Sequence, residues 1–253
     1  MSTRAQAGPR GWSGSATPRL KQGACPCARR GLSRMEACGD QTMEVAVADK
    51  PDIGRIARVY VEAFPESVKF FFGDSTPERV VKIASAGFHV LWQAGCGFIV
   101  ARESDGDVQG YCIIAADEAE VRASFFKNAV WLGFVKDLLR RRIPLRLNEA
   151  ARLAANGAVL LLSYLVAPRN YACRAGARIF SIAVRKAARG RGLGRELLKC
   201  ALAFATGKGA KVIKLEVRPE NQAAVHLYRS AGFREVGKVK DLQGPWLAME
   251  KTL

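Results

Sequence analysis

A strand, a glycine-rich turn and the start of a helix follow one another in residues 182–194, IAVRKAARGRGLG. The glycines of this stretch permit backbone conformations that other residues rarely adopt, and apolar residues continue at helical spacing to Gly207. Free N–H groups and the positive end of the helix make such a turn a site for an anion. Arg189, Arg191 and Arg195 add positive charge. The stretch therefore predicts a site for a diphosphate.

Two other phosphate-binding patterns do not match. No Gly-Lys-Ser/Thr follows the turn, so it is not a Walker P-loop. A dinucleotide-binding fold is the closer rival, since Glu216 lies about where its ribose-binding acid would be. However, the last glycine of that fingerprint would fall on Arg195 or on Leu197, and too little chain remains for a full dinucleotide domain.

The remaining pattern is that of an α/β protein. Residues 177–253 predict strand, helix, strand, helix, strand and strand, and residues 43–115 predict a strand, two helices and a strand hairpin. Residues 117–176 between them are basic and mostly helical in pattern. Their apolar stretch Leu153–Val166 has 14 residues, fewer than the roughly 20 that span a bilayer. We expect it to be buried core and not a membrane span.

The chain has 253 residues and a net charge of +17, which favours an anionic partner. The excess is strongest in residues 177–253, with 16 basic against 6 acidic side chains. Residues 1–42 have no hydrophobic period and are rich in Gly, Ser, Pro and Arg. They predict a disordered basic tail or a start assigned too early, with one domain over residues 43–253.

The seven cysteines do not suggest a disulfide framework. Three lie in apolar surroundings and are expected to be small buried side chains: Cys96, Cys112 and Cys200. Three others lack a fourth ligand at the usual spacing, so we expect no metal site: Cys25, Cys27 and Cys38. No secretory hydrophobic region stands at the start, so we expect reduced thiols and a cytoplasmic location.

Two motifs resemble those of the GNAT superfamily, the Gcn5-related N-acetyltransferases. RGRGLG at residues 189–194 resembles motif A, and LEVRPEN at residues 215–221, followed by Leu227-Tyr228 and Gly232-Phe233, resembles motif B. The resemblance spans about residues 179–233. It implies a mixed, mostly antiparallel central sheet, splayed between its fourth and fifth strands and flanked by helices. Residues 117–176 would then be a helical insert.

The resemblance also implies acetyl-CoA as the cosubstrate, and no metal. Backbone groups of one strand would pair with the pantetheine arm: Ile182, Ala183 and Val184. The turn would wrap the pyrophosphate: Arg189, Gly190, Arg191, Gly192, Leu193 and Gly194. Asn221 would also contact the cofactor.

Acetyl transfer to an amine needs two proton transfers, one from the amine and one to the departing thiolate. The resemblance places Tyr228 as the proton donor, and we expect Glu216 on the preceding strand to be the base. The alternatives are a core tyrosine and a structural ion pair or solvent-facing carboxylate. Because no cysteine or serine is placed by a motif at the split, we expect direct attack without an acetyl-enzyme.

The sequence therefore favours an acetyl-CoA-dependent N-acetyltransferase, as a monomer or homodimer. The acceptor is left open between a small-molecule amine and a protein N-terminal amine. The motif B string is also similar to that of ribosomal-protein alanine N-acetyltransferases. The alternatives are a non-catalytic CoA-binding module and a basic module that binds nucleic acid or an anionic surface. No nucleic-acid-binding module is recognisable, so we expect no specific nucleic-acid partner.

Overall fold

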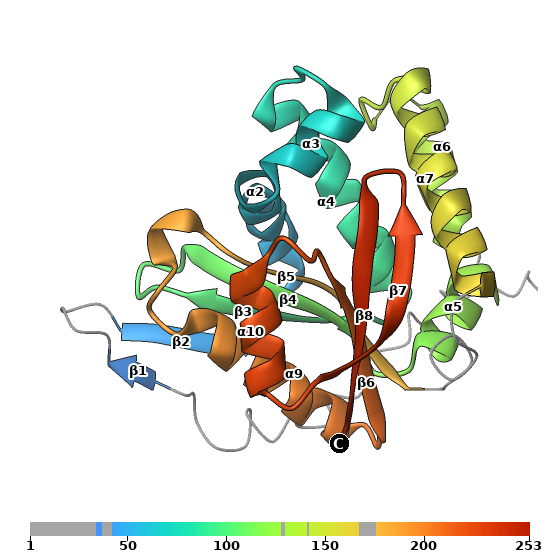
Figure 1. The fold of residues 1–253 in the computed structure, drawn as a ribbon. Helices are drawn as coiled ribbons and strands as arrows, with labels where there is room; N and C mark the ends of the chain where they lie inside the picture. The colour runs from blue at the N-terminus through green and yellow to red at the C-terminus, as the bar shows by residue number, and fades with distance from the viewer. Residues whose placement is uncertain (1–33, 37–41, 128–129, 141, 167–175) are drawn as a thin grey trace, which may run out of the picture.

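The computed structural model of the protein describes residues 34–36, 42–127, 130–140, 142–166 and 176–253 (Figure 1). The strands form one sheet in the order β1-β2-β3-β4-β5-β6-β8-β7. Neighbouring strands are antiparallel, except that β5 and β6 are parallel. The strands are β1 (Arg34–Glu36), β2 (Thr42–Val47), β3 (Gly97–Arg102), β4 (Val108–Ala115), β5 (Ala177–Val184), β6 (Val212–Val217), β7 (Arg234–Asp241) and β8 (Gly244–Thr252). The mixed, mostly antiparallel α/β fold is the one predicted.

Helices cover both faces of the sheet (Figure 1). The α-helices are α2 (Ile53–Ala63), α3 (Pro65–Phe72), α4 (Pro77–Gln93), α5 (Glu118–Lys127), α6 (Val130–Leu139), α7 (Leu147–Val166), α9 (Leu193–Gly207) and α10 (Gln222–Ser230). Two short 3-10 helices, η1 (Lys50–Asp52) and η2 (Lys186–Ala188), precede α2 and α9. The sequence pattern did not predict α3, because its run of phenylalanines has no helical period.

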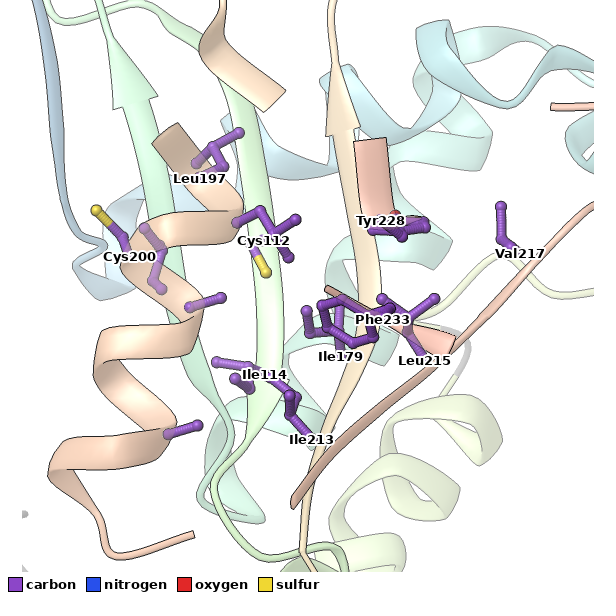
Figure 2. Close-up of a cluster of buried hydrophobic side chains, with 14 of the residues drawn as sticks. Cys112, Ile114, Ile179, Leu197, Cys200, Ile213, Leu215, Val217, Tyr228 and Phe233 are labelled. Carbon is purple, nitrogen blue, oxygen red and sulfur yellow. The ribbon is translucent and has the colours of Figure 1, made fainter. Parts of the chain in front are cut away.

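The central strand β4 shows how the two layers are built. Cys112 and Ile114 pack with α9 and α10, whereas Tyr111 and Ile113 pack with α2 and α4. Since side chains alternate along a strand, both faces of β4 are covered by helices and all its residues are buried. Figure 2 shows part of the first cluster. The sheet is therefore held rigidly on both sides of the strand that borders β5.

In the insert, residues 117–176, the described part consists of α5, α6 and α7. Arg79 of α4 holds the first turn of α7, because its two guanidinium nitrogens contact the Glu149 carboxylate at 2.7 and 2.6 Å. At the middle of α7, the Asn156 side chain accepts a 2.9 Å hydrogen bond from the backbone N–H of Leu242, between β7 and β8. The insert therefore connects α4 with the far end of the sheet.

One expectation about the insert is wrong. Leu153 and Leu162 of the apolar stretch Leu153–Val166 are exposed and not buried core. The stretch lies on the surface helix α7, which directs only some of its side chains, such as Leu160, into a cluster with β7 and β8. Within the described ranges, no helix is long and apolar enough to cross a bilayer.

Near the N-terminus, Arg34–Glu36 pairs as β1 with Thr42–Glu44 of β2. These residues fall within the segment 1–42 that the sequence predicts to be a tail. The rest of that segment up to residue 41 lies outside the described residues, as do Cys25, Cys27 and Cys38. The domain boundary at residue 43 stays a prediction.

Candidate active site

The two parallel strands β5 and β6 start side by side and then separate. Among the described residues they pair only at Ala177–Ile213 and Arg178–Lys214. β5 nevertheless remains paired with β4 as far as Val184, and β6 pairs with β8 along its length. The splay predicted between the fourth and fifth strands therefore lies between β5 and β6, which are numbered one higher because β1 precedes them.

β5 contains the three residues expected to pair with the pantetheine arm of the cofactor, and one edge of this strand faces the split. One edge of β5 pairs Ile182, Ala183 and Val184 with β4, so the opposite edge borders the split. The register with β4 shifts at Phe180, which leaves that residue without a partner in the ladder. The shift changes which side chains of β5 face each side of the sheet. It directs Ser181 to the Tyr111 hydroxyl, 2.8 Å away, on the α2 and α4 side.

The glycine-rich turn follows β5 directly. Gly190 and Gly192 both have φ near 80°, in the left-handed region that favours glycine. Gly192 is the N-cap residue of α9 and offers no side chain to the free N–H groups of the first turn. A Cβ added at Gly190 would meet none of the described atoms within 4 Å. The turn therefore presents backbone donors and open space, which fits a phosphate.

The basic side chains of the turn are not equivalent. Arg191 pairs with Glu103 at 3.4 Å, and Arg185 pairs with Asp107 at 2.6 Å, so the hairpin between β3 and β4 holds both. Arg189 and Arg195 are exposed, and in the described part of the chain no carboxylate pairs with either. Two of the three arginines predicted to add charge are therefore available to an anion. The sequence analysis did not predict that the acids of this hairpin pair with Arg185 and Arg191.

Tyr228 lies on α10, inside the cluster between the two separating strands. Its side chain is buried, and its ring centroid lies 5.8 Å from that of Phe233. Figure 2 shows it with Ile179 of β5 and Leu215 of β6 in the same cluster. Burial raises the pKa of Tyr228, so the phenol keeps its proton at neutral pH. Tyr228 is therefore a core residue that also carries a proton next to the split, so its core position is compatible with a role as proton donor.

Glu216 lies on the opposite face of β6 from Leu215, because side chains alternate along the strand. Its carboxylate pairs with Arg178 of β5 at 2.9 Å, and the same guanidinium pairs with Glu118 of α5 at 2.8 Å. The buried Lys214 is on the same face, and burial lowers its pKa. The expected base therefore takes part in an ion-pair network that reaches the insert.

Asn221, the other expected cofactor contact, is the N-cap residue of α10. Its side-chain oxygen accepts a 3.1 Å hydrogen bond from the backbone N–H of Ala224. This bond is typical of an N-cap and fixes the start of the helix that carries Tyr228. Asn221 is exposed, so its amide nitrogen faces solvent or a ligand.

Three cysteines are buried, as predicted: Cys96, Cys112 and Cys200. Burial raises the pKa of Cys96 to about 12 and also raises that of Cys112. A thiol in this state is a poor nucleophile. Among the described residues, no group of three or more potential ligands could hold a metal ion.

The same segment also matches known proteins. Residues 154–233 match the acetyltransferase (GNAT) family. The matched segment contains the glycine turn, Asn221 and Tyr228. The N-alpha-acetyltransferase RimI of Mycobacterium tuberculosis is 51% identical over 59 residues, 23% of this chain and 35% of the relative. An uncharacterized N-acetyltransferase of Methanocaldococcus jannaschii is 36% identical over 84 residues, 33% of this chain and 35% of the relative. The chain thus spans about a third of these curated relatives.

Solved structures extend the likeness to the whole fold. SsHAT is 19% identical with a TM-score of 0.59, covering 83% of this chain and 98% of that one. PH1933 of Pyrococcus horikoshii is 21% identical with a TM-score of 0.51, covering 83% and 98%. At these identities the likeness concerns the fold alone, and it includes the N-terminal half that the family match leaves out.

The sequence missed Arg178 and Glu118 as neighbours of the site. Arg178 stands 38 positions before Glu216, and Glu118 belongs to the insert, which no motif covers. The one available signal was an arginine in an otherwise apolar strand. A lone charge of this kind points to a buried ion pair but does not identify its partners.

Proposed function

We propose that the protein transfers the acetyl group of acetyl-CoA to a primary amine. The observation that carries the proposal is the split between β5 and β6, with a glycine turn of open backbone donors at its end and the buried phenol of Tyr228 beside it. The GNAT family match over residues 154–233 supports the same assignment.

The cofactor site would be made mostly of backbone. Residues 182–184 would pair with the pantetheine arm along the edge of β5 that does not face β4. Residues 189–194 would hold the pyrophosphate through N–H groups and the positive end of α9. Arg189 and Arg195 would add charge, and the amide of Asn221 would contact the cofactor from α10.

Two side chains would handle the protons. Acetyl-CoA, when bound, supplies the thioester that an amine can attack. Glu216 would take the proton of the amine, directly or through one water, and Arg178 would hold the carboxylate in place at 2.9 Å. Tyr228 would donate its proton to the departing sulfur, since its raised pKa keeps the phenol protonated until then.

Direct attack fits these side chains better than a covalent intermediate. An acetyl-enzyme would need a thiolate or an activated hydroxyl at the split. Cys112 lies in the same cluster as Tyr228, but its burial raises the pKa of the thiol and so disfavours the thiolate. No bond to the protein is then required during the transfer.

The acceptor would approach from the face of the sheet that Glu216 shares with α2, α4 and the insert. On this side the Ser67 hydroxyl of α3 donates a 2.9 Å hydrogen bond to the side-chain oxygen of Gln243, between β7 and β8. This contact joins the elements on either side of the split. The acceptor is a primary amine, either a small molecule or a protein N-terminus, and similarity to RimI over 59 residues favours the N-terminus.

The test is thiol release from acetyl-CoA across a panel of peptides and small amines. We expect amine-dependent release, with Glu216→Gln slower mainly at neutral pH and less so at high pH, where free amine is abundant. Glu235→Gln is the matched control. Glu235 also pairs with an arginine, Arg229, but it lies on β7, which does not border the split. If coenzyme A binds but no acceptor releases thiol, the protein is a non-catalytic binding module.

A further inference from the structure

The helix α6 has a buried apolar side and, about 110° further around the helix, an exposed apolar stripe. Its inner side places Phe134 and Leu138 against a buried cluster that includes Phe72 of α3 and Val80 of α4. Its outer side carries a stripe of exposed apolar residues at positions i, i+3 and i+7: Leu132, Val135 and Leu139, which are 49%, 36% and 78% exposed. An ordinary surface helix has polar residues on its outer side, so this stripe needs an explanation.

The connection from α6 to α7 ends at a further exposed leucine. Leu147, the first residue of α7, is 91% exposed. Leu139 and Leu147 are the two most exposed large apolar side chains in the part of the chain that the structure describes. A leucine in water at this exposure gains nothing for the fold, so a ligand or surface that covers it would be favoured.

Positive charge borders the stripe. Lys136 and Arg140 each follow a stripe residue by one position, which places them about 100° further around the helix. Arg142 and Arg146 are exposed in the connection. The leucines, Val135 and these four cations together form what we name the α6–α7 surface: Leu132, Val135, Lys136, Leu139, Arg140, Arg142, Arg146 and Leu147.

Three acids of the insert are already paired with arginines. Glu149 is buried against Arg79, and Glu118 is paired with Arg178. Asp137 pairs with Arg142 at 3.3 Å, but both side chains are well exposed, and such a pair is weak. The α6–α7 surface therefore combines exposed apolar side chains with exposed cations.

We propose that the α6–α7 surface docks the protein on an anionic lipid bilayer, with α6 lying in the interface. The acyl boundary covers leucines, and anionic head groups attract the flanking cations, which is how interfacial amphipathic helices bind. A nucleic acid offers phosphates but no apolar layer for the leucines. A second copy of the chain would place cations against cations. The proposal is independent of the acetyl transfer.

The test is co-sedimentation of the full chain with vesicles of phosphatidylglycerol and phosphatidylcholine, or of phosphatidylcholine alone. We expect binding to the anionic vesicles, little binding to the neutral ones, and a loss as salt rises. The double variant Leu139→Ser/Leu147→Ser should weaken binding at least about tenfold, because two apolar side chains leave the interface. Both leucines are exposed, so the fold should be retained.

Matched controls separate this surface from the basic remainder of the chain. Leu242→Ser removes an exposed leucine between β7 and β8 and should bind like the parent. Lys208→Glu/Lys238→Glu removes as much exposed charge as Arg140→Glu/Arg146→Glu, and only the second pair should abolish binding. The proposal is overturned if the parent does not sediment with anionic vesicles or if the leucine variant binds undiminished. It is equally overturned if light scattering shows that the two leucines hold a dimer together.

Discussion

The helices α9 and α6 are both rich in apolar residues, yet they use them differently. α9 buries its apolar face against the sheet, with Leu197, Leu198 and Ala201 almost without solvent contact. α6 buries one apolar side and exposes another. α9 starts at the glycine turn that forms the candidate cofactor site, so its position must be fixed. The insert is instead attached through polar contacts and two smaller apolar clusters, and it leaves an apolar surface exposed.

The difference shows that packing fixes the residues of the candidate site on one side of the molecule and leaves apolar residues exposed on the other. On the C-terminal side, burial holds the turn, Tyr228 and the edge of β5 in one arrangement. On the insert side, Glu149 and Asn156 attach α7 to α4 and to the turn between β7 and β8, and Glu118 attaches α5 to β5, all by polar contacts. Changes on the first side should therefore affect chemistry, and changes on the second should affect docking and stability.

The largest effect is expected at Tyr228. Tyr228→Phe removes one hydroxyl and no packing volume, so coenzyme A affinity should stay near that of the parent. A lost general acid typically costs about 10²–10⁴-fold in rate, and kcat should fall by that order. Steady-state kinetics and calorimetry together check both halves of this expectation.

The control for this variant is Tyr111→Phe on the other side of the sheet. It also removes a buried hydroxyl, but one that is bonded to Ser181 at 2.8 Å. Its cost should be about 1 kcal/mol of unfolding free energy with little change in kcat. Equal losses of kcat in the two variants would mean that Tyr228 is a packing residue.

The next largest effect concerns the attachment of the insert. Arg79→Met should cost about 3–5 kcal/mol of unfolding free energy, because it leaves the buried Glu149 carboxylate without its partner. The exposed pair Arg142–Asp137 lies in the same insert, so Arg142→Met should cost less than about 1 kcal/mol. Urea denaturation measures both, and equal costs would contradict the account of the insert.

The same pair gives a pH dependence. The hydrogen bond from Arg79 lowers the pKa of Glu149 below its usual 4.5. A carboxylate with a lowered folded-state pKa stabilises the fold above its unfolded pKa, and this stability is lost as the pH falls through the folded value. The stability difference between the parent and Glu149→Gln should therefore be constant above about pH 5 and shrink below about pH 4. If this stability difference grew as the pH fell, the pKa of Glu149 would be raised in the folded state and not lowered, which would contradict the prediction.

A smaller effect is expected at Arg178, which joins Glu216 to α5. Arg178→Met should slow turnover about 10–100-fold through misplacement of Glu216, with coenzyme A affinity retained. Its pH–rate profile should shift toward that of Glu216→Gln. Arg218→Met is the control, since Arg218 follows the same strand but pairs with Asp241, at 3.0 Å. If the pH–rate profile of Arg178→Met were the same as that of the parent, Glu216 would not be the base that Arg178 positions.

The smallest effect is expected at the N-terminus. Deletion of residues 1–33 should leave both the melting temperature and activity unchanged. Deletion of residues 1–42 also removes β1, the edge strand that pairs with β2, and should lower the melting temperature by a few degrees. Scanning calorimetry of both deletions against the full chain decides whether the domain begins at residue 43. A large loss from the shorter deletion would make residues 1–33 structural.

Sequence alone could predict the sheet halves and the turn, because both depend on local signals, whereas the role of Tyr228 is implied by the GNAT resemblance and stays a prediction. Gly190 and Gly192 have left-handed backbone conformations that few other residues adopt, so the spacing of the glycines predicts the turn. The Arg178–Glu118 contact could not be predicted, since it joins strand and insert through tertiary packing. The outer stripe of α6 was equally hidden, because apolar spacing does not tell a covered face from an uncovered one.

The central claim, that the glycine turn after β5 binds coenzyme A, can be tested by calorimetric titration of two glycine variants. Gly192 and Gly209 have φ of 80° and 82°, at the start and just beyond the end of α9. Valine should strain both positions by roughly 1–2 kcal/mol, but only position 192 faces the proposed pyrophosphate. We predict that Gly192→Val weakens coenzyme A binding at least about tenfold, whereas Gly209→Val binds like the parent. Equal affinity of the two variants would place the cofactor elsewhere.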